Sequence, residues 1–236
     1  MRRQIRRAFN AFGFDIARTP WQRDEAFGAL VARVQAEVPI SASVGRCWIL
    51  YSLARQAARL AGEFWECGVY KGGTALLLAH VLAAGAGEPP PLRLFDTFAG
   101  MPPTDPDRDR HRAGDFGDTS LAAVRRRLPA AFVAFHPGRL PETFRGLEGA
   151  AIAMAHVDVD IYRSVLDCCE FIYPRLVAGG VLLFDDYGFP TCPGARQAVD
   201  EFFAGRPEVP LCLPTGQAVV FRLPAPGAPP LAPAGP

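Results

Sequence analysis

The sequence predicts an α/β protein built on a doubly wound, Rossmann-like sheet whose strands are mostly parallel. From about residue 63 onward, short apolar strands alternate with apolar stripes at helical spacing, and carboxylates follow several strands where they end. Because crossover helices join buried parallel strands, both faces of the sheet should be covered. Two short final strands with a short connection predict an antiparallel hairpin at the C-terminal edge.

The chain is expected to have a first region that precedes the sheet and a second region that forms it. Residues 1–60 read as an N-terminal helical extension, and residues 61–223 as the main domain. One helix face of the extension gathers Ile49, Leu50, Leu53, Ala57 and Leu60. The first half of the main domain is expected to contain a strand over 63–67, a fully apolar and therefore buried helix over 74–84, a strand over 92–95, a helix over 120–128 and a strand over 132–135.

The second half of the main domain repeats this alternation. Gly179 and Gly180 are expected to end its first helix and to start the next strand. The expected elements are a strand over 151–157, a helix from Val165 to about 178, a strand over 181–184, a helix over 195–203 and short strands over 209–213 and 218–223.

Two segments lack such periodicity. Residues 98–118 are rich in Asp, Pro, Gly and Arg, and loops of this length are uncommon inside compact domains unless they act as lids or are disordered. We expect a lid. Residues 224–236 are Pro, Ala and Gly apart from Leu231, which predicts a disordered tail.

Composition excludes several classes of protein. A net charge of +1 argues against a nucleic-acid-coating protein, which needs a basic excess to displace counterions. No apolar signal region follows the N-terminal arginines, and no apolar run is long enough to cross a bilayer, so we expect a cytoplasmic protein without membrane contact. Neither a zinc site nor a disulfide framework is indicated by the spacing of Cys47, Cys67, Cys168, Cys169, Cys192 and Cys212.

The small net charge conceals an uneven distribution. Residues 1–60 are rich in arginine, whereas residues 150–200 are acidic. The acidic part is therefore the place to look for a cation. The arginine-rich, apolar extension suits a subunit contact, and we expect a homo-oligomer.

Ligands of doubly wound sheets bind at the carboxyl ends of the strands. The first predicted strand is followed by a glycine-containing turn with Gly68 and Gly72, which lets a ligand approach the backbone at a helix N-terminus. A tight turn alone also requires glycine. Asp96 ends the second strand, where a carboxylate can accept both ribose hydroxyls of an adenosine cofactor; the alternative is that Asp96 caps the following turn.

The strongest local signal is a set of carboxylates after two consecutive predicted strands. Asp158 and Asp160 end one strand, and Asp185 and Asp186 end the next. If these strands are neighbours, the carboxylates crowd together and repel unless a cation neutralises them. Oxygen ligands suit Mg²⁺, Mn²⁺ or Ca²⁺. Helix capping explains one acid at each strand end but not two.

Five motifs in register resemble those of the macrocin O-methyltransferase (TylF-like) family, a group of class I S-adenosylmethionine-dependent methyltransferases. The resemblance covers about residues 40–204, with His156-Val157 as a departure from the purely apolar strand expected there. The motifs are Glu66–Gly73, Phe95–Pro102, Asp158–Ser164, Gly179–Gly188 and Pro193–Phe202.

This resemblance implies an S-adenosylmethionine- and Mg²⁺-dependent O-methyltransferase that acts on a sugar or glycoside hydroxyl. Glu66, Gly68 and Gly72 would line the methionine part of the cofactor, and Asp96 would hold its ribose. The metal would be held by Asp158, Asp185 and Asp186. Asp158 or Asp160 would accept the proton from the hydroxyl, and the division of labour between these two stays open. His111, in the predicted lid, is a further candidate proton acceptor.

Other functions remain open at this point. A nicotinamide-dependent oxidoreductase would share the sheet and Asp96 but needs a tighter glycine signature. A non-catalytic binding protein would have no need of the acids. Within methyltransferases, catechol-type and metal-independent enzymes are the alternatives.

Overall fold

The computed structural model describes residues 20–128, 131–224 and 227. Its described part is centred on a seven-stranded sheet of order β3-β2-β1-β4-β5-β7-β6. The first five strands of this order are parallel, and β7 and β6 complete the edge in antiparallel pairing. The strands are β1 (Glu63–Cys67), β2 (Leu92–Asp96), β3 (Val133–Pro137), β4 (Ile152–Val157), β5 (Leu176–Phe184), β6 (Leu211–Cys212) and β7 (Ala218–Phe221).

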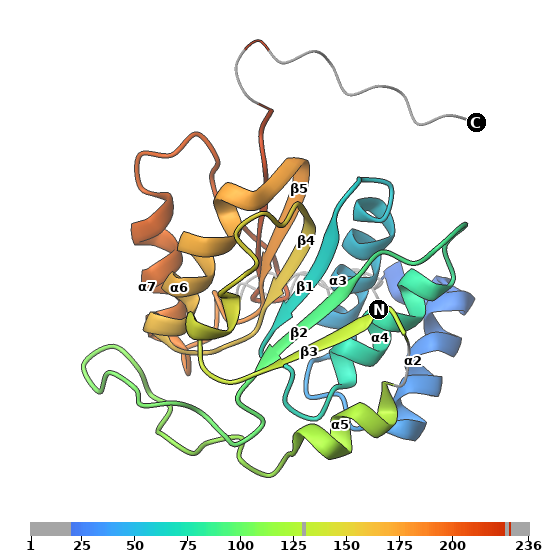
Figure 1. The fold of residues 1–236 in the computed structure, drawn as a ribbon, viewed down its shortest axis with the longest axis horizontal. Coiled ribbons are helices and arrows are strands. Elements are labelled where there is room, and N and C mark those ends of the chain that lie inside the picture. Colours follow the sequence, from blue (N-terminus) through green and yellow to red (C-terminus); the bar gives the residue numbers. More distant parts are fainter. Residues whose placement is uncertain (1–19, 129–130, 225–226, 228–236) are drawn as a thin grey trace, which may run out of the picture.

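Helices cover both faces of the sheet, as Figure 1 shows. One core packs α2, α3 and α4 against the sheet, and a second core packs α6 and α7 against its other face. The helices are α2 (Glu25–Glu37), α3 (Val44–Ala57), α4 (Gly73–Ala83), α5 (Leu121–Arg127), α6 (Tyr162–Ile172) and α7 (Pro193–Phe203), with short 3₁₀ turns η1 (Pro20–Arg23), η2 (Glu142–Phe144) and η3 (Tyr173–Arg175).

The predicted fold class is confirmed: the fold is α/β, and its doubly wound, mixed sheet ends in an antiparallel hairpin. The helix after β1 is apolar on every side and is buried along most of its length, because it lies between the sheet and the helices of the extension. One predicted boundary is wrong. Gly179 and Gly180 lie inside β5, and the preceding helix ends at Ile172, because Pro174 removes a backbone donor and the chain turns through η3.

The N-terminal extension is helical where the structure describes it. Asp24 caps α2 by accepting a hydrogen bond from the Phe27 amide, and Ser43 caps α3 in the same way through the Arg46 amide. Residues 1–19 lie outside the described part, as does nearly all of the predicted disordered tail. Among the described helices, none is long and apolar enough to cross a membrane.

The order of the strands reverses between β1 and β4. The chain moves from β1 outward to β2 and β3, and then returns to place β4 on the other side of β1. At such a point the crossover helices diverge and leave a crevice at the carboxyl ends of the strands. The functional residues predicted from the sequence lie at the ends of β1 and β2 or follow β1, β4 and β5, so they gather at this edge.

Candidate active site

A cavity of about 330 Å³ opens at the carboxyl edge of the sheet. Its walls come from the turn after β1, the end of β2, the segments after β4 and β5, and the long loop 98–118. Figure 1 shows this loop running from β2 past the lower ends of α6 and α7 before it reaches α5. Segments that are far apart in the sequence therefore enclose one site.

The turn after β1 is shaped by close packing against β4. Gly68 has a φ of +88°, and a Cβ at this position would lie 1.8 Å from the Asp158 carbonyl oxygen, so no other residue fits. Gly73 and Thr74, at the start of α4, line the cavity, whereas Gly72 packs against Val124 of α5. The N-terminus of α4 therefore borders the cavity, and a helix N-terminus favours a carboxylate or phosphate.

The Asp96 carboxylate connects this turn to β2. Its Oδ2 accepts hydrogen bonds from the amides of Val69 (2.7 Å) and Tyr70 (2.8 Å), and its Oδ1 accepts one from the amide of Phe98 (2.6 Å). The turn-capping alternative is thus present in the structure. Thr97 Oγ1 also lies 3.5 Å from Oδ1, but it donates its only proton to the Gly100 carbonyl oxygen (2.6 Å). Asp96 also lines the cavity, and a carboxylate has about four lone-pair positions, so one acceptor position is left for a ligand hydroxyl.

Three carboxylates face the cavity together: Asp158, Asp160 and Asp186. Burial, and then the negative charges of Asp158, Asp160 and Asp185, raise the pKa of Asp186 well above its usual range. Burial and the charge of Asp185 do the same to the pKa of Asp158. Asp160 has a left-handed φ of +59°, and its amide donates a hydrogen bond to Asp186 (3.0 Å). Like charges in a half-buried site favour either a bound proton or a bound cation.

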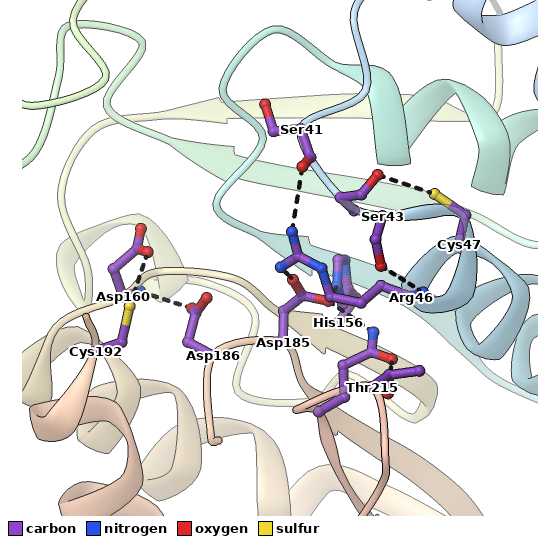
Figure 2. A network of polar contacts seen from close by, with 12 residues as sticks. Ser41, Ser43, Arg46, Cys47, His156, Asp160, Asp185, Asp186, Cys192 and Thr215 are labelled. Carbon is purple, nitrogen blue, oxygen red and sulfur yellow. Dashed lines mark hydrogen bonds and ion pairs between the residues drawn. The ribbon is translucent and has the colours of Figure 1, made fainter. Parts of the chain in front are cut away.

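Asp185 turns away from the cavity into a buried polar network (Figure 2). Its Oδ2 accepts a hydrogen bond from the Arg46 guanidinium of α3, and its Oδ1 accepts one from the Gln217 amide (2.7 Å). His156 lies between Asp185 (3.3 Å) and Glu66 (2.9 Å). Burial lowers the pKa of His156, but hydrogen bonds to both carboxylates outweigh it and raise the pKa well above its usual range. The His156 imidazolium and Arg46 thus neutralise the two buried acids.

Sequence reasoning missed the roles of Arg46 and His156. Arg46 also lies over the Phe189 ring at 5.0 Å and lines the cavity, so it joins the extension to the segment after β5. The signal for His156 was present as a polar residue inside an apolar strand. Arg46 carried no such signal, because the extension is rich in arginine throughout.

Comparison with known proteins decides the family. The family model described as Macrocin-O-methyltransferase (TylF) matches residues 53–212. The chain belongs to the macrocin O-methyltransferase (TylF) family. The matched region contains every strand up to β6 and all the acids at the carboxyl edge, and the extension adds Arg46 to the cavity wall.

Curated relatives of this TylF-family chain include proteins named as O-methyltransferases of tetracenomycin and mycinamicin compounds. The chain is 30% identical over 153 residues to an 8-demethyl-8-(2,3-dimethoxy-alpha-L-rhamnosyl)-tetracenomycin-C 4'-O-methyltransferase of Streptomyces olivaceus, with 60% of this chain and 58% of that protein covered. It is 31% identical over 155 residues to a mycinamicin III 3''-O-methyltransferase of Micromonospora griseorubida, with 60% of each chain covered. The match thus spans about three fifths of each relative.

Solved structures share the TylF-type fold. The O-methyltransferase NovP matches with a TM-score of 0.65 and 25% identity, over 74% of this chain and 79% of NovP. The calicheamicin methyltransferase CalS11 matches with a TM-score of 0.66 and 18% identity, over 92% of this chain and 96% of CalS11. The second likeness supports the fold alone.

The structure places the residues predicted for this TylF-family site in two groups. Gly68, Asp96, Asp158, Asp160 and Asp186 line the cavity. The other three, Glu66, Gly72 and Asp185, do not: Glu66 and Asp185 are buried around His156, and Gly72 faces α5. His111 of loop 98–118 also lines the cavity.

Proposed function

We propose that the protein transfers a methyl group from S-adenosylmethionine to a sugar hydroxyl of a glycosylated natural product. The observation that carries the proposal is Asp158: in a TylF-family chain, it presents to the cavity a carboxylate for which no hydrogen-bond partner is found among the described side chains and amides. The names of the curated relatives support a sugar hydroxyl as acceptor.

S-adenosylmethionine fits the half of the cavity between β1 and β2. The first amides of α4, at Gly73 and Thr74, are placed to receive its carboxylate, and the remaining acceptor position of Asp96 suits one ribose hydroxyl. Glu66 lies behind this wall and supports it through His156. When bound, the cofactor supplies an electrophilic methyl group on a sulfonium centre.

Magnesium fits the acidic half of the cavity. Asp158 and Asp186 offer the oxygen ligands that Mg²⁺ prefers, and Mg²⁺ commonly takes one or two carboxylates while it keeps several waters. Both oxygens of Asp185, the third predicted ligand, already have partners in Arg46, His156 and Gln217. When bound, the ion would acidify and orient the acceptor hydroxyl.

Asp158 is the residue that we assign to proton acceptance. Burial and the charge of Asp185 raise the pKa of Asp158 toward neutral pH, and a carboxylate with a higher pKa is a more effective base. Asp160 is less available, because the Cys192 thiol donates to its Oδ1. Loop 98–118 covers the site through Gly100, Met101 and Phe116, and so would exclude water from the reacting atoms.

A calorimetric titration with S-adenosylmethionine and with NAD, each with and without Mg²⁺, tests this proposal. We expect S-adenosylmethionine to bind and NAD not to bind, and a mass-shift screen of glycosides and catechols should show methylation of glycosides. Asp158→Asn should lower kcat by about 100-fold or more while the cofactor still binds. NAD binding without S-adenosylmethionine binding would refute the proposal, and full activity in EDTA would refute its magnesium part.

A further inference from the structure

A second cluster of potential ligands lies beside the three acids. His111 from loop 98–118, Asp160 after β4 and Cys192 before α7 meet at the wall of the cavity. In Figure 2 Asp160 and Cys192 point toward each other on the side of Asp186 away from Arg46. These ligands come from three separate segments, and nothing in the proposed methyl transfer requires a thiol there.

The three ligand atoms form a nearly equilateral triangle. His111 Nε2 lies 3.6 Å from Cys192 Sγ and 3.7 Å from Asp160 Oδ1, and Sγ lies 3.4 Å from the same Oδ1. Tetrahedral zinc has bonds of about 2.0–2.3 Å to such atoms, which places any two of them about 3.3–3.7 Å apart. All three edges therefore have the length expected for one face of a zinc tetrahedron.

The surroundings of the imidazole also match a metal ligand. His111 Nδ1 faces the Asp115 carboxylate at 3.3 Å, on the opposite side of the ring from the cluster. Zinc-bound histidines usually donate their second N–H to a carboxylate, which fixes the ring and raises its basicity. Phe116 packs against the ring with its centroid 5.4 Å away. His111 is therefore held with Nε2 directed at the other two ligands.

We propose that His111, Asp160 and Cys192 bind a zinc ion whose fourth position opens into the cavity. Three protein ligands and an open position are the arrangement of zinc sites that bind water or substrate. Imidazole and thiolate ligands favour zinc over magnesium, so this site is chemically distinct from the all-oxygen pair Asp158 and Asp186. The thiol proton is released to solvent as the ion binds.

The ion would connect loop 98–118 to the sheet. Two of its ligands follow β4 and β5, and the third lies in the loop, so binding holds the loop over the cavity. At this site Asp160 is a zinc ligand, which leaves Asp158 as the proton acceptor proposed above. The inference depends on the geometry of the cluster and not on the proposed methyl transfer.

Cobalt substitution tests the proposal without an activity assay. The tag-free protein, reduced with a phosphine, is titrated with Co²⁺ and followed by absorption. We expect one ion per chain, tetrahedral d–d bands, a sulfur-to-cobalt charge-transfer band, and loss of all bands when Zn²⁺ is added. Excess Mg²⁺ should leave them unchanged. Bands that fail to develop, or that Mg²⁺ removes, would overturn the proposal.

Variants identify the ligands. Cys192→Ser should abolish the charge-transfer band, whereas the matched control Cys212→Ser, at an exposed cysteine, should keep it. His111→Gln should weaken Co²⁺ binding by more than Asp115→Asn, for which a loss of about 10–100-fold is expected. Circular dichroism of each metal-free variant verifies folding, and if Cys192→Ser does not fold, the two loop variants decide. Unchanged affinity in both loop variants, or a band that survives Cys192→Ser, would refute the site.

Discussion

At the scale of single residues, three aspartates at the carboxyl edge of the sheet differ in pKa because their surroundings differ. Burial raises the pKa of the Asp185 carboxyl. The opposing effect of His156 and Arg46 is larger, so the pKa lies below its usual value. Asp158 and Asp186 have no such cationic hydrogen-bond partner among the described residues, and burial raises their pKa values. The position after a strand is shared by all of them. The cation opposite each carboxylate decides whether it stabilises the fold or remains available to a ligand.

Arg46→Gln should expose this difference. The substitution removes the guanidinium from a buried carboxylate, and breaking such a pair costs about 3–5 kcal/mol of unfolding free energy. It also frees Oδ2 of Asp185 for an ion, so added Mg²⁺ should raise the melting temperature of the variant by more than that of the unmodified protein. Arg55→Gln, at an exposed position of the same helix, is the control. Equal responses to Mg²⁺ would argue against Asp185 as a potential ligand.

At the scale of elements, turns hold the cavity in shape through backbone contacts. The turn after β1 packs against the backbone after β4, and Asp96 ties the same turn to β2 through two amides. Away from the cavity, buried Glu208 also joins two segments through hydrogen bonds. It accepts hydrogen bonds from Tyr173 of η3 (2.5 Å) and Arg222 (2.7 Å), and so joins η3 to the segment after β7.

Gly68→Ala should destabilise the protein much more than Gly87→Ala. Both glycines have positive φ, of +88° and +94°, so both alanines suffer the left-handed strain of about 1–2 kcal/mol. A Cβ at Gly87 meets nothing within 4 Å, whereas a Cβ at Gly68 overlaps the Asp158 carbonyl. Thermal unfolding of the two variants measures the contribution of this contact. Similar melting temperatures would mean that the turn can move away from β4.

Glu208→Gln should reduce stability by about 3 kcal/mol at neutral pH. Burial raises the pKa of Glu208, but the hydrogen bonds from Tyr173, Arg222 and Leu223 outweigh it and hold the pKa below its usual value. The stabilisation is therefore complete above the unfolded-state pKa of about 4.3 and is lost as pH falls through the folded-state pKa.

Urea unfolding at neutral pH and at about pH 3, well below the unfolded-state pKa of about 4.3, checks this dependence on Glu208. The difference between Glu208→Gln and the unmodified protein should shrink on acidification. Glu201→Gln, at an exposed glutamate that accepts a hydrogen bond from Tyr162, should leave stability nearly unchanged at either pH. A difference that stays constant with pH would show that packing, and not charge, makes the contribution of Glu208.

At the scale of the whole molecule, loop 98–118 is the segment that encloses the crevice. Asp109 of this loop is buried and accepts a hydrogen bond from the Tyr162 amide at the start of α6 (2.8 Å). Met101 and Phe116 line the cavity from the same loop. The loop therefore contacts the helix layer on one face while it covers a site formed at the centre of the sheet. A ligand that fills the cavity should stabilise the loop.

Limited trypsin digestion tests this lid. Cleavage after Arg108, Arg110 and Arg112 should slow when S-adenosylhomocysteine is bound, because the closed loop presents less mobile backbone to the protease. Cleavage after Arg59, outside the cavity, should be unaffected. Mass spectrometry of early fragments gives both rates, and equal slowing at all four sites would indicate general stabilisation instead of closure.

The sequence alone was sufficient for the order of elements, the parallel sheet with its antiparallel edge, and the edge at which the acids gather. These follow from local patterns: apolar runs of strand or helix length, glycine at a tight turn, and carboxylates directly after strands. The strand end of β5 was predicted correctly, but its start was not, because two glycines resemble a turn even when they lie in a strand.

Only the tertiary structure decided what each acid faces. Asp185 and Asp186 are adjacent in sequence, but one is paired with Arg46 and the other lines the cavity, because successive side chains at a strand end point in opposite directions. The meeting of His111, Asp160 and Cys192 was likewise invisible to spacing rules. Their proximity results from how a long loop and two strand ends fold together, and no local pattern encodes contacts between such distant segments.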